Sequence, residues 1–254
     1  MRTIMKQLVH YGVNRTFLLV TISAAQLHAA SAQEEIRRLP PTRIAVDEDI
    51  LAAFVDEPCR NFEDAREAVS RGENKRAAHY LRVAAAFLRL EATRATAEGS
   101  LMLDMSIREL QHLALSIDNN QIPELAVLKP AFARAHYALA GHHCIKSAHH
   151  CCPPAAFENK AAMNRVGHDL NAAATHLNRG AIWVDREPDD ETLDVLNAAE
   201  FSAQRLIKSG QAPQGEVARA IRSVRDKLED FTGRKILLAP PMAGYDQFVP
   251  STLR

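Results

Sequence analysis

Glycine and proline interrupt this 254-residue chain at intervals close to the length of a helix, and this punctuation limits what it can fold into. The stretches between them are mostly about 14 to 30 residues long, with apolar residues at spacings of three and four and no sustained alternation. The interrupting residues are Pro58, Gly72, Gly99, Pro123, Pro153, Pro154, Pro188, Gly210, Pro213 and Gly233. We therefore predict an all-α fold, a single-domain antiparallel helical bundle of about six or seven helices in residues 47–235.

The apolar stripes place the first helices. One is expected over residues 57–71, and a second from about residue 74 to residue 98, where Gly99 and Ser100 signal a stop and a new start. The arginines and glutamates of the second helix, Glu91 among them, are expected to lie largely off its apolar stripe.

Later helices follow the same reasoning. The fourth is expected to run to about His149, with Pro130 kinking or restarting it, and the fifth to end near Trp183. Asp189 and Asp190 can cap a sixth helix. The last helix carries a heptad-like stripe that suits a homodimer and equally suits packing inside one chain. That stripe consists of Val217, Ile221, Val224, Leu228 and Phe231.

The first 32 residues have the pattern of a secretory signal peptide. A basic beginning is followed by an apolar run from Phe17 to Ala25 and an A-x-A site at residues 30–32. The run is shorter than the ~20 residues that span a membrane, so no transmembrane segment is expected after cleavage. We therefore expect a soluble periplasmic protein with a disordered leader over residues 33–46 and a C-terminal tail over residues 236–254.

The charge balance of the mature chain excludes one class of partner. The signal peptide contains three basic residues and no acidic ones, so its removal changes 31 basic and 31 acidic residues to 28 and 31, a net charge of −3. Nucleic-acid-binding proteins normally carry a basic excess. The composition therefore argues against a nucleic-acid partner.

Histidine and cysteine are concentrated in one part of the chain. Seven of the eleven histidines and three of the four cysteines lie between His136 and His176. Imidazole and thiolate are the preferred ligands of zinc and copper, which makes this stretch a candidate metal site. The candidate ligands are His136, His142, His143, Cys144, His149, His150, Cys151 and His168.

The spacing of these residues argues against a site on a single helix. They recur every seven residues, which places successive members about 10.5 Å apart along a helix axis. Ligands from the next helix would have to complete the site, for example in a His136–His168 pair with Asp169 nearby, or a His143–Met163 pair suited to copper(I). Alternatively, the loop around His149 to Cys152 folds back on the preceding helix.

Two other interpretations of the same stretch remain open. Because disulfides persist in exported proteins, Cys144, Cys151 or Cys152 could bridge to Cys59 and staple the bundle. A reactive thiol at Cys151 or Cys152 would instead indicate a redox protein.

With no complete catalytic motif in the chain, a non-enzymatic binding, stress or interaction role in the cell envelope is the leading hypothesis. Periplasmic transition-metal binding and thiol redox chemistry are its alternatives.

Overall fold

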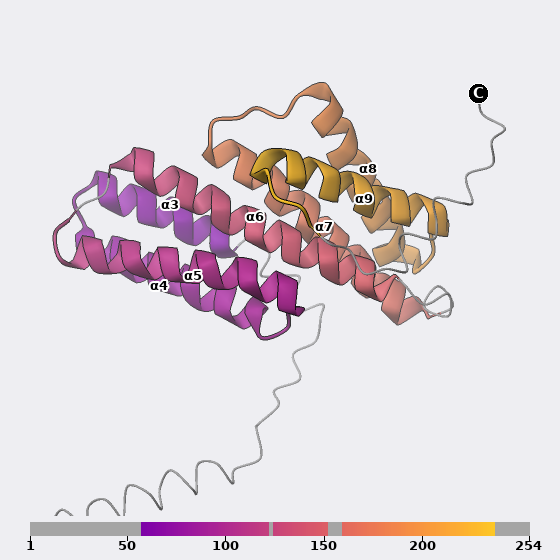
Figure 1. The fold of residues 1–254 in the computed structure, drawn as a ribbon, viewed down its shortest axis with the longest axis horizontal. Coiled ribbons are helices and arrows are strands. Elements are labelled where there is room, and N and C mark those ends of the chain that lie inside the picture. Colours follow the sequence, from indigo (N-terminus) through magenta and orange to yellow (C-terminus); the bar gives the residue numbers. More distant parts are fainter. Residues whose placement is uncertain (1–56, 122–123, 152–158, 237–254) are drawn as a thin grey trace, which may run out of the picture. The chain divides into compact units, whose positions relative to one another are not determined.

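The computed structural model describes residues 57–121, 124–151 and 159–236, and all regular secondary structure in these ranges is α-helical (Figure 1). The prediction of an all-α helical bundle is confirmed. The predicted signal peptide and leader, and the tail from residue 237 onward, lie outside the described residues. The helices are α3 (Glu57–Ser70), α4 (Asn74–Ala92), α5 (Ala97–Asp118), α6 (Leu125–His150), α7 (Lys160–Trp183), α8 (Asp190–Ser209) and α9 (Gln214–Thr232).

The capping and terminating residues recognised in the sequence account for the start of α8 and for the ends of α8 and α9. Asp189 caps α8, because its Oδ1 accepts a hydrogen bond from the backbone N–H of Thr192 at 2.9 Å. Gly210 and Gly233 follow the last residues of α8 and α9 with φ near +67° and +64°. This left-handed conformation is accessible to glycine at little cost, so both helices stop where the sequence indicates.

The boundary between α4 and α5 differs from the sequence prediction. Helix α4 ends at Ala92 rather than near residue 98, and Thr96 caps the start of α5 by accepting a hydrogen bond from Gly99 N at 3.3 Å. Gly99 is therefore part of the first turn of α5. The absence of a side chain at Gly99 also leaves room for the His142 ring, because a Cβ at this position would lie 3.2 Å from Nδ1 of His142.

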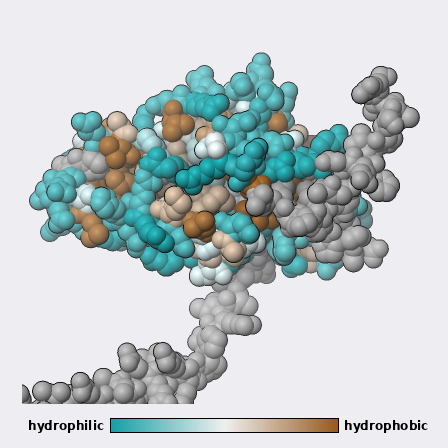
Figure 2. Space-filling view, viewed as in Figure 1, coloured by the Kyte–Doolittle hydropathy of each residue, from teal (hydrophilic) through white to brown (hydrophobic). Residues whose placement is uncertain are grey.

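Helix α6 lies at the centre of the bundle and packs against α5, α7 and α9, with further contacts to α3 and α4 (Figure 1). Most of its residues from Ala131 to Ala148 are buried, and Pro130 lies within the helix without ending it. The face seen in Figure 2 is mainly hydrophilic, with separate hydrophobic patches. Within the described ranges no helix combines the length and apolarity that crossing a bilayer requires.

The apolar stripe of α9 is used inside the chain. Its side chains at Val217, Ile221, Val224 and Leu228 have no exposed surface, and the helix packs on α6, α7 and α8. The stripe on which the homodimer prediction was based is therefore covered by the protein's own helices.

Close packing of α7 on α8 gives a first testable prediction. A Cβ added at Gly167 would lie 2.9 Å from the backbone oxygen of Ala203 and from side-chain carbons of Leu206 and Ile207. We expect Gly167→Ala to lower the free energy of unfolding by about 1–3 kcal/mol, because overpacking outweighs the better helix propensity of alanine. The matched control is Gly215→Ala in α9, where a Cβ meets nothing within 4 Å. Urea denaturation of both variants provides the measurement, and equal stability of the two would contradict the prediction.

Candidate metal centre

Polar side chains of α6 and α7 face each other in layers through the core. His136, His143 and His150 follow one another at heptad spacing on α6, and Asp169 and His176 have the same spacing on α7. His136 contacts His176, whereas His143, further along α6, contacts Asp169, earlier in α7. The order of these two contacts means that α6 and α7 run in opposite directions where they meet.

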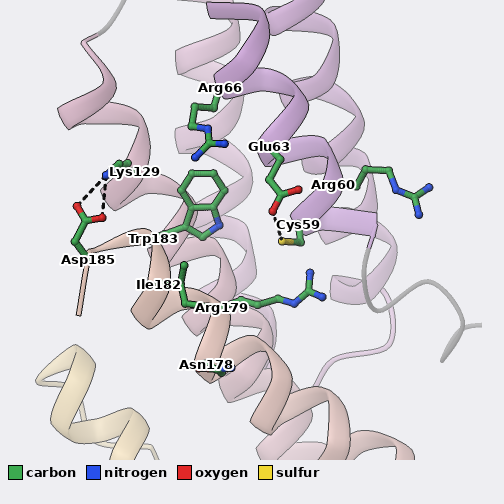
Figure 3. A pocket seen from close by; sticks show the side chains of 10 residues that line it. All are labelled: Cys59, Arg60, Glu63, Arg66, Lys129, Asn178, Arg179, Ile182, Trp183 and Asp185. Atoms are coloured by element: carbon green, nitrogen blue, oxygen red, sulfur yellow. Dashed lines mark hydrogen bonds and ion pairs between the residues drawn. The ribbon is translucent and has the colours of Figure 1, made fainter. Parts of the chain in front are cut away.

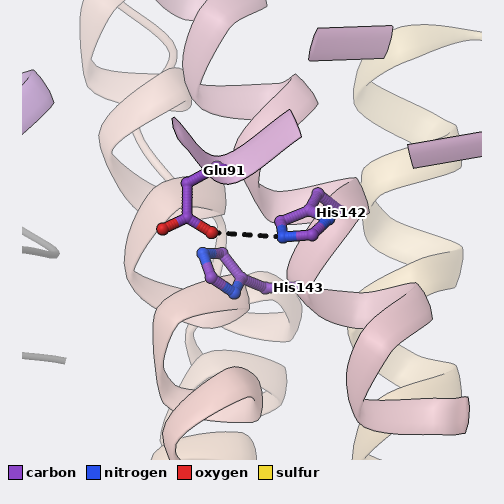
Figure 4. Close-up of side chains that lie close together, drawn as sticks. All are labelled: Glu91, His142 and His143. Atoms are coloured by element: carbon purple, nitrogen blue, oxygen red, sulfur yellow. Dashed lines mark hydrogen bonds and ion pairs between the residues drawn. The ribbon is translucent and has the colours of Figure 1, made fainter. Parts of the chain in front are cut away.

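A glutamate from α4 completes a group of three possible metal ligands. One ligand atom from each of Glu91, His142 and His143 lies within 4.8 Å of the others. Figure 4 shows the Glu91 carboxylate beside both rings, with one oxygen toward His142 and a ring nitrogen of His143 turned toward it. Nε2 of His142 and Oε2 of Glu91 are 3.2 Å apart. All three residues are buried, with exposed fractions of 3%, 1% and 8% in the order Glu91, His142, His143.

The protonation states of this group suit a cation. Burial opposes ionisation of Glu91, but the hydrogen bond from His142 and the nearby charges of the histidines and Arg94 outweigh it and lower the pKa of Glu91 to about 2. Burial lowers the pKa of His142 in spite of the Glu91 carboxylate. At neutral pH the site therefore offers one carboxylate and a neutral imidazole, the forms in which these groups bind metals.

Asp169 supports His143 from the side away from Glu91. Its Oδ1 lies 3.0 Å from Nδ1 of His143 and 3.2 Å from Nζ of Lys146. Although burial opposes it, the hydrogen bond from His143 and the interactions with His150 and Lys146 hold the pKa of Asp169 well below its usual range. A carboxylate bonded to one ring nitrogen of a histidine fixes the tautomer and turns the other nitrogen toward a metal.

The group could hold one transition-metal ion after the side chains close in. Three ligand atoms bound at ~2.0–2.2 Å to one tetrahedral ion are about 3.4 Å apart. The ligand atoms of the group lie within 4.8 Å of one another, so the widest separation must shorten by up to about 1.4 Å, a distance calculated from these bond lengths. Two histidines and one carboxylate form a ligand set known for zinc and for non-haem iron.

His136 and His176 form a separate buried pair. Their Nδ1 atoms are 3.1 Å apart, neither ring is exposed, and Phe62 contacts His136 edge-on with ring centroids 5.2 Å apart. Burial lowers the pKa of His136 to about 3 and that of His176 well below its ordinary value, with the charge of Arg179 adding to both effects. Both imidazoles are therefore neutral at neutral pH.

The other predicted ligands lie in different surroundings. The thiol of Cys144 points toward α9, where it donates to the backbone oxygen of Ile221 at 3.5 Å. His149 is exposed, His168 is half-buried on α7, and Cys151 is buried directly after the end of α6. The structure thus brings His142 and His143 to one site, pairs His136 with His176, and places Cys144 and His149 elsewhere.

The predicted disulfide staple is absent from the described cysteines Cys59 and Cys144, which are both free thiols. The two residues lie in different parts of the core, Cys59 beside Glu63 on α3 and Cys144 facing α9. Burial raises the pKa of Cys59, and it raises the pKa of Cys144 to about 12. Neither thiol is activated as a nucleophile at neutral pH. Cys152 lies outside the described residues.

A pocket of about 610 Å³ opens between α3, α6 and α7 (Figure 3). Several of the side chains that line it already interact with one another. Lys129 pairs with Asp185 at 2.8 Å, the Cys59 thiol donates to Glu63 at 3.6 Å, and the Arg66 guanidinium lies 5.5 Å from the centre of the Trp183 ring. The pocket has no group of metal ligands like that around Glu91.

The burial of Glu91 beside the histidines was not predicted from the sequence, although the sequence contains a signal for it. Ala84, Leu88, Glu91 and Ala95 follow one another at spacings of four, three and four, so Glu91 occupies a core position of α4. Its 3% exposure contradicts the expectation that it lies off the stripe. A carboxylate at a core position of a helix indicates a buried partner.

Comparisons with known proteins add no family to this description. No protein-family model, no curated protein and no solved structure matches the chain. The functional argument therefore depends on the buried site itself.

Proposed function

We propose that this protein is a transition-metal-binding helical protein that holds one divalent ion at Glu91, His142 and His143. The observation that carries the proposal is the convergence of a buried carboxylate and two histidines from α4 and α6. The Glu91 carboxylate is paired with His142 at 3.2 Å and with Arg94 at 3.4 Å, and a metal ion would add a further partner for this buried charge. This favours the metal-binding alternative from the sequence over the thiol redox alternative.

The burial of the site supports binding rather than catalysis. Catalytic metal sites keep a coordination position open to substrate, whereas structural and storage sites are closed by protein. The three residues are at most 8% exposed, which leaves little access for a substrate. We therefore propose a non-enzymatic role such as metal storage or delivery. The signal-peptide pattern of residues 1–32 supports a periplasmic location.

Zinc titration of the metal-free protein tests this function. We expect one tightly bound ion, and Glu91→Gln or His142→Gln should weaken zinc binding more than about 100-fold, beyond the 10–100-fold typical of losing a supporting residue. His112→Gln changes an exposed histidine on α5 and serves as the control. Competition with a zinc-binding dye gives the affinity, and copper(II) and nickel(II) measured in the same way give the selectivity. Equal affinities of Glu91→Gln and the control would refute the proposed site.

A further inference from the structure

A second cavity, of about 630 Å³, lies between α5, α6 and the C-terminal end of α9. Its volume falls within the ~300–1,000 Å³ that is typical of small-molecule sites. Most of the side chains that line it are apolar, and they come from all three helices and from the residues just after α9. These apolar side chains include Met102, Met105, Leu228, Phe231 and Ile236.

The walls of this cavity suit an apolar ligand. Met102 and Met105 of α5 are unbranched and flexible, so their side chains can adjust to the shape of a bound molecule. On the opposite helices the rings of Tyr137 and Phe231 are stacked, with centroids 5.9 Å apart. Burial raises the pKa of Tyr137 to about 12, so its phenol is an uncharged hydrogen-bond donor at neutral pH.

The charges at this cavity favour an anion. Three charged residues line it, namely Glu109, Arg134 and Arg234. Arg134 is neutralised by Glu109, because its Nε lies 3.0 Å from Oε2 of that carboxylate. The side chain of Arg234 contacts only Sδ of Met105, at 3.8 Å from Nη1, and no carboxylate in the described part of the chain pairs with it. One positive charge at the cavity is therefore left without a counter-charge.

A second guanidinium strengthens this positive potential. Arg186 lies 4.1 Å from the centre of the Phe231 ring, on a residue that lines the cavity. An apolar space with an unneutralised cation at its edge fits a molecule that has an apolar body and one negative group. The planar guanidinium of arginine matches the two oxygens of a carboxylate, which makes a carboxylate the best-fitting group.

We propose that this cavity binds an apolar carboxylate of the medium-chain fatty-acid class. The hydrocarbon chain is expected to pack on Met102, Leu228 and Phe231, where burial of apolar surface supplies most of the affinity. The carboxylate is expected to pair with Arg234. The proposal goes beyond the metal site and does not depend on it, because none of Glu91, His142 and His143 lines the cavity.

Calorimetric titration with decanoate and with decanol tests this inference, because the two molecules share an apolar chain and differ in charge. The unaltered protein should bind decanoate more tightly than decanol. Arg234→Gln should weaken decanoate binding roughly 5- to 10-fold and leave decanol binding unchanged, since only the carboxylate loses a partner. Lys235→Gln is the matched control, because Lys235 is the neighbouring cation, its side chain is 89% exposed, and it pairs with Glu229 at 2.7 Å.

Methyl resonances of the methionines locate the bound molecule. Decanoate should shift the methyl signals of Met102 and Met105 and leave that of Met163, which is buried in α7, unchanged. Failure of the unaltered protein to bind decanoate would overturn the inference, including the case in which the residues after Ile236 occupy the cavity instead. Equal losses of decanoate affinity in Arg234→Gln and Lys235→Gln would also overturn it, as would binding that leaves Met102 and Met105 unshifted.

Discussion

Replacing Asp169 with asparagine is expected to lower the free energy of unfolding of the metal-free protein by about 3–5 kcal/mol, the usual cost of removing one partner from a buried ion pair. Asp169 is 3% exposed, and one of its oxygens serves both His143 and Lys146. The amide has nearly the same shape but carries no charge, so the partly buried ammonium of Lys146 loses the carboxylate opposite it. Urea denaturation monitored by circular dichroism measures the change.

Asp226→Asn provides the control for this prediction. Asp226 also pairs with a basic residue, Arg225, but its side chain is 60% exposed. Exposed pairs contribute about 0–1 kcal/mol, so this variant should differ little from the unaltered protein. If Asp169→Asn were no more destabilising than Asp226→Asn, the buried network would have no special energetic role.

Acidification of the metal-free protein is expected to cost at least about 2 kcal/mol of stability between about pH 7 and pH 5, because the pKa values of His136, His142 and His176 are lowered in the folded state. In the unfolded chain His136 and His176 take up protons near the ordinary histidine pKa of about 6.5. In the folded protein burial lowers the pKa of His136 to about 3 and that of His176 well below its ordinary value. With its pKa near 3, His136 therefore contributes about 2 kcal/mol over this interval, and His176 and His142 change the stability in the same direction.

The sign and the pH window of this effect identify its source. Between the folded and unfolded pKa values the unfolded chain binds more protons, so stability is full above about pH 7 and falls as the pH decreases. The lowered pKa values of Glu91 and Asp169 act only below their ordinary range, near pH 4, and so do not contribute above pH 5. Denaturation at several pH values gives the slope. His136→Gln should remove about 2 kcal/mol of the pH-dependent loss, whereas His79→Gln, which changes an exposed histidine, should leave the loss unchanged.

The sequence predicted the helices well because their ends are local. Asp189 and Gly210 bound α8 through contacts within a few residues, and such contacts can be inferred from the chain alone. The end of α4 was predicted about six residues too late, because Gly99 was interpreted as a terminator. In the structure it is a first-turn residue that leaves room for His142, a residue of a distant helix.

The candidate site could be located in part. The cluster of histidines pointed to α6, and the heptad spacing indicated that one helix cannot complete a site; the group around Glu91 combines residues of α4 and α6. The partners could not be derived, because they depend on how each neighbouring helix is rotated about its axis. For this reason His136 was expected to face His168 but contacts His176, eight residues later, and Glu91 was expected off the apolar stripe but is buried.

The polar layers between α6 and α7 also determine how the two helices align. Apolar stripes alone tolerate a slide of one heptad, because similar side chains would meet again. Such a slide would still place His136 or His150 opposite Asp169, because the histidines of α6 recur every seven residues. It would, however, separate the Asp169 carboxylate from the Lys146 ammonium, which has no basic counterpart seven residues earlier at Leu139. The ion pair with Lys146, rather than the recurring histidines, therefore distinguishes one register from the next, at the expense of an entirely apolar core.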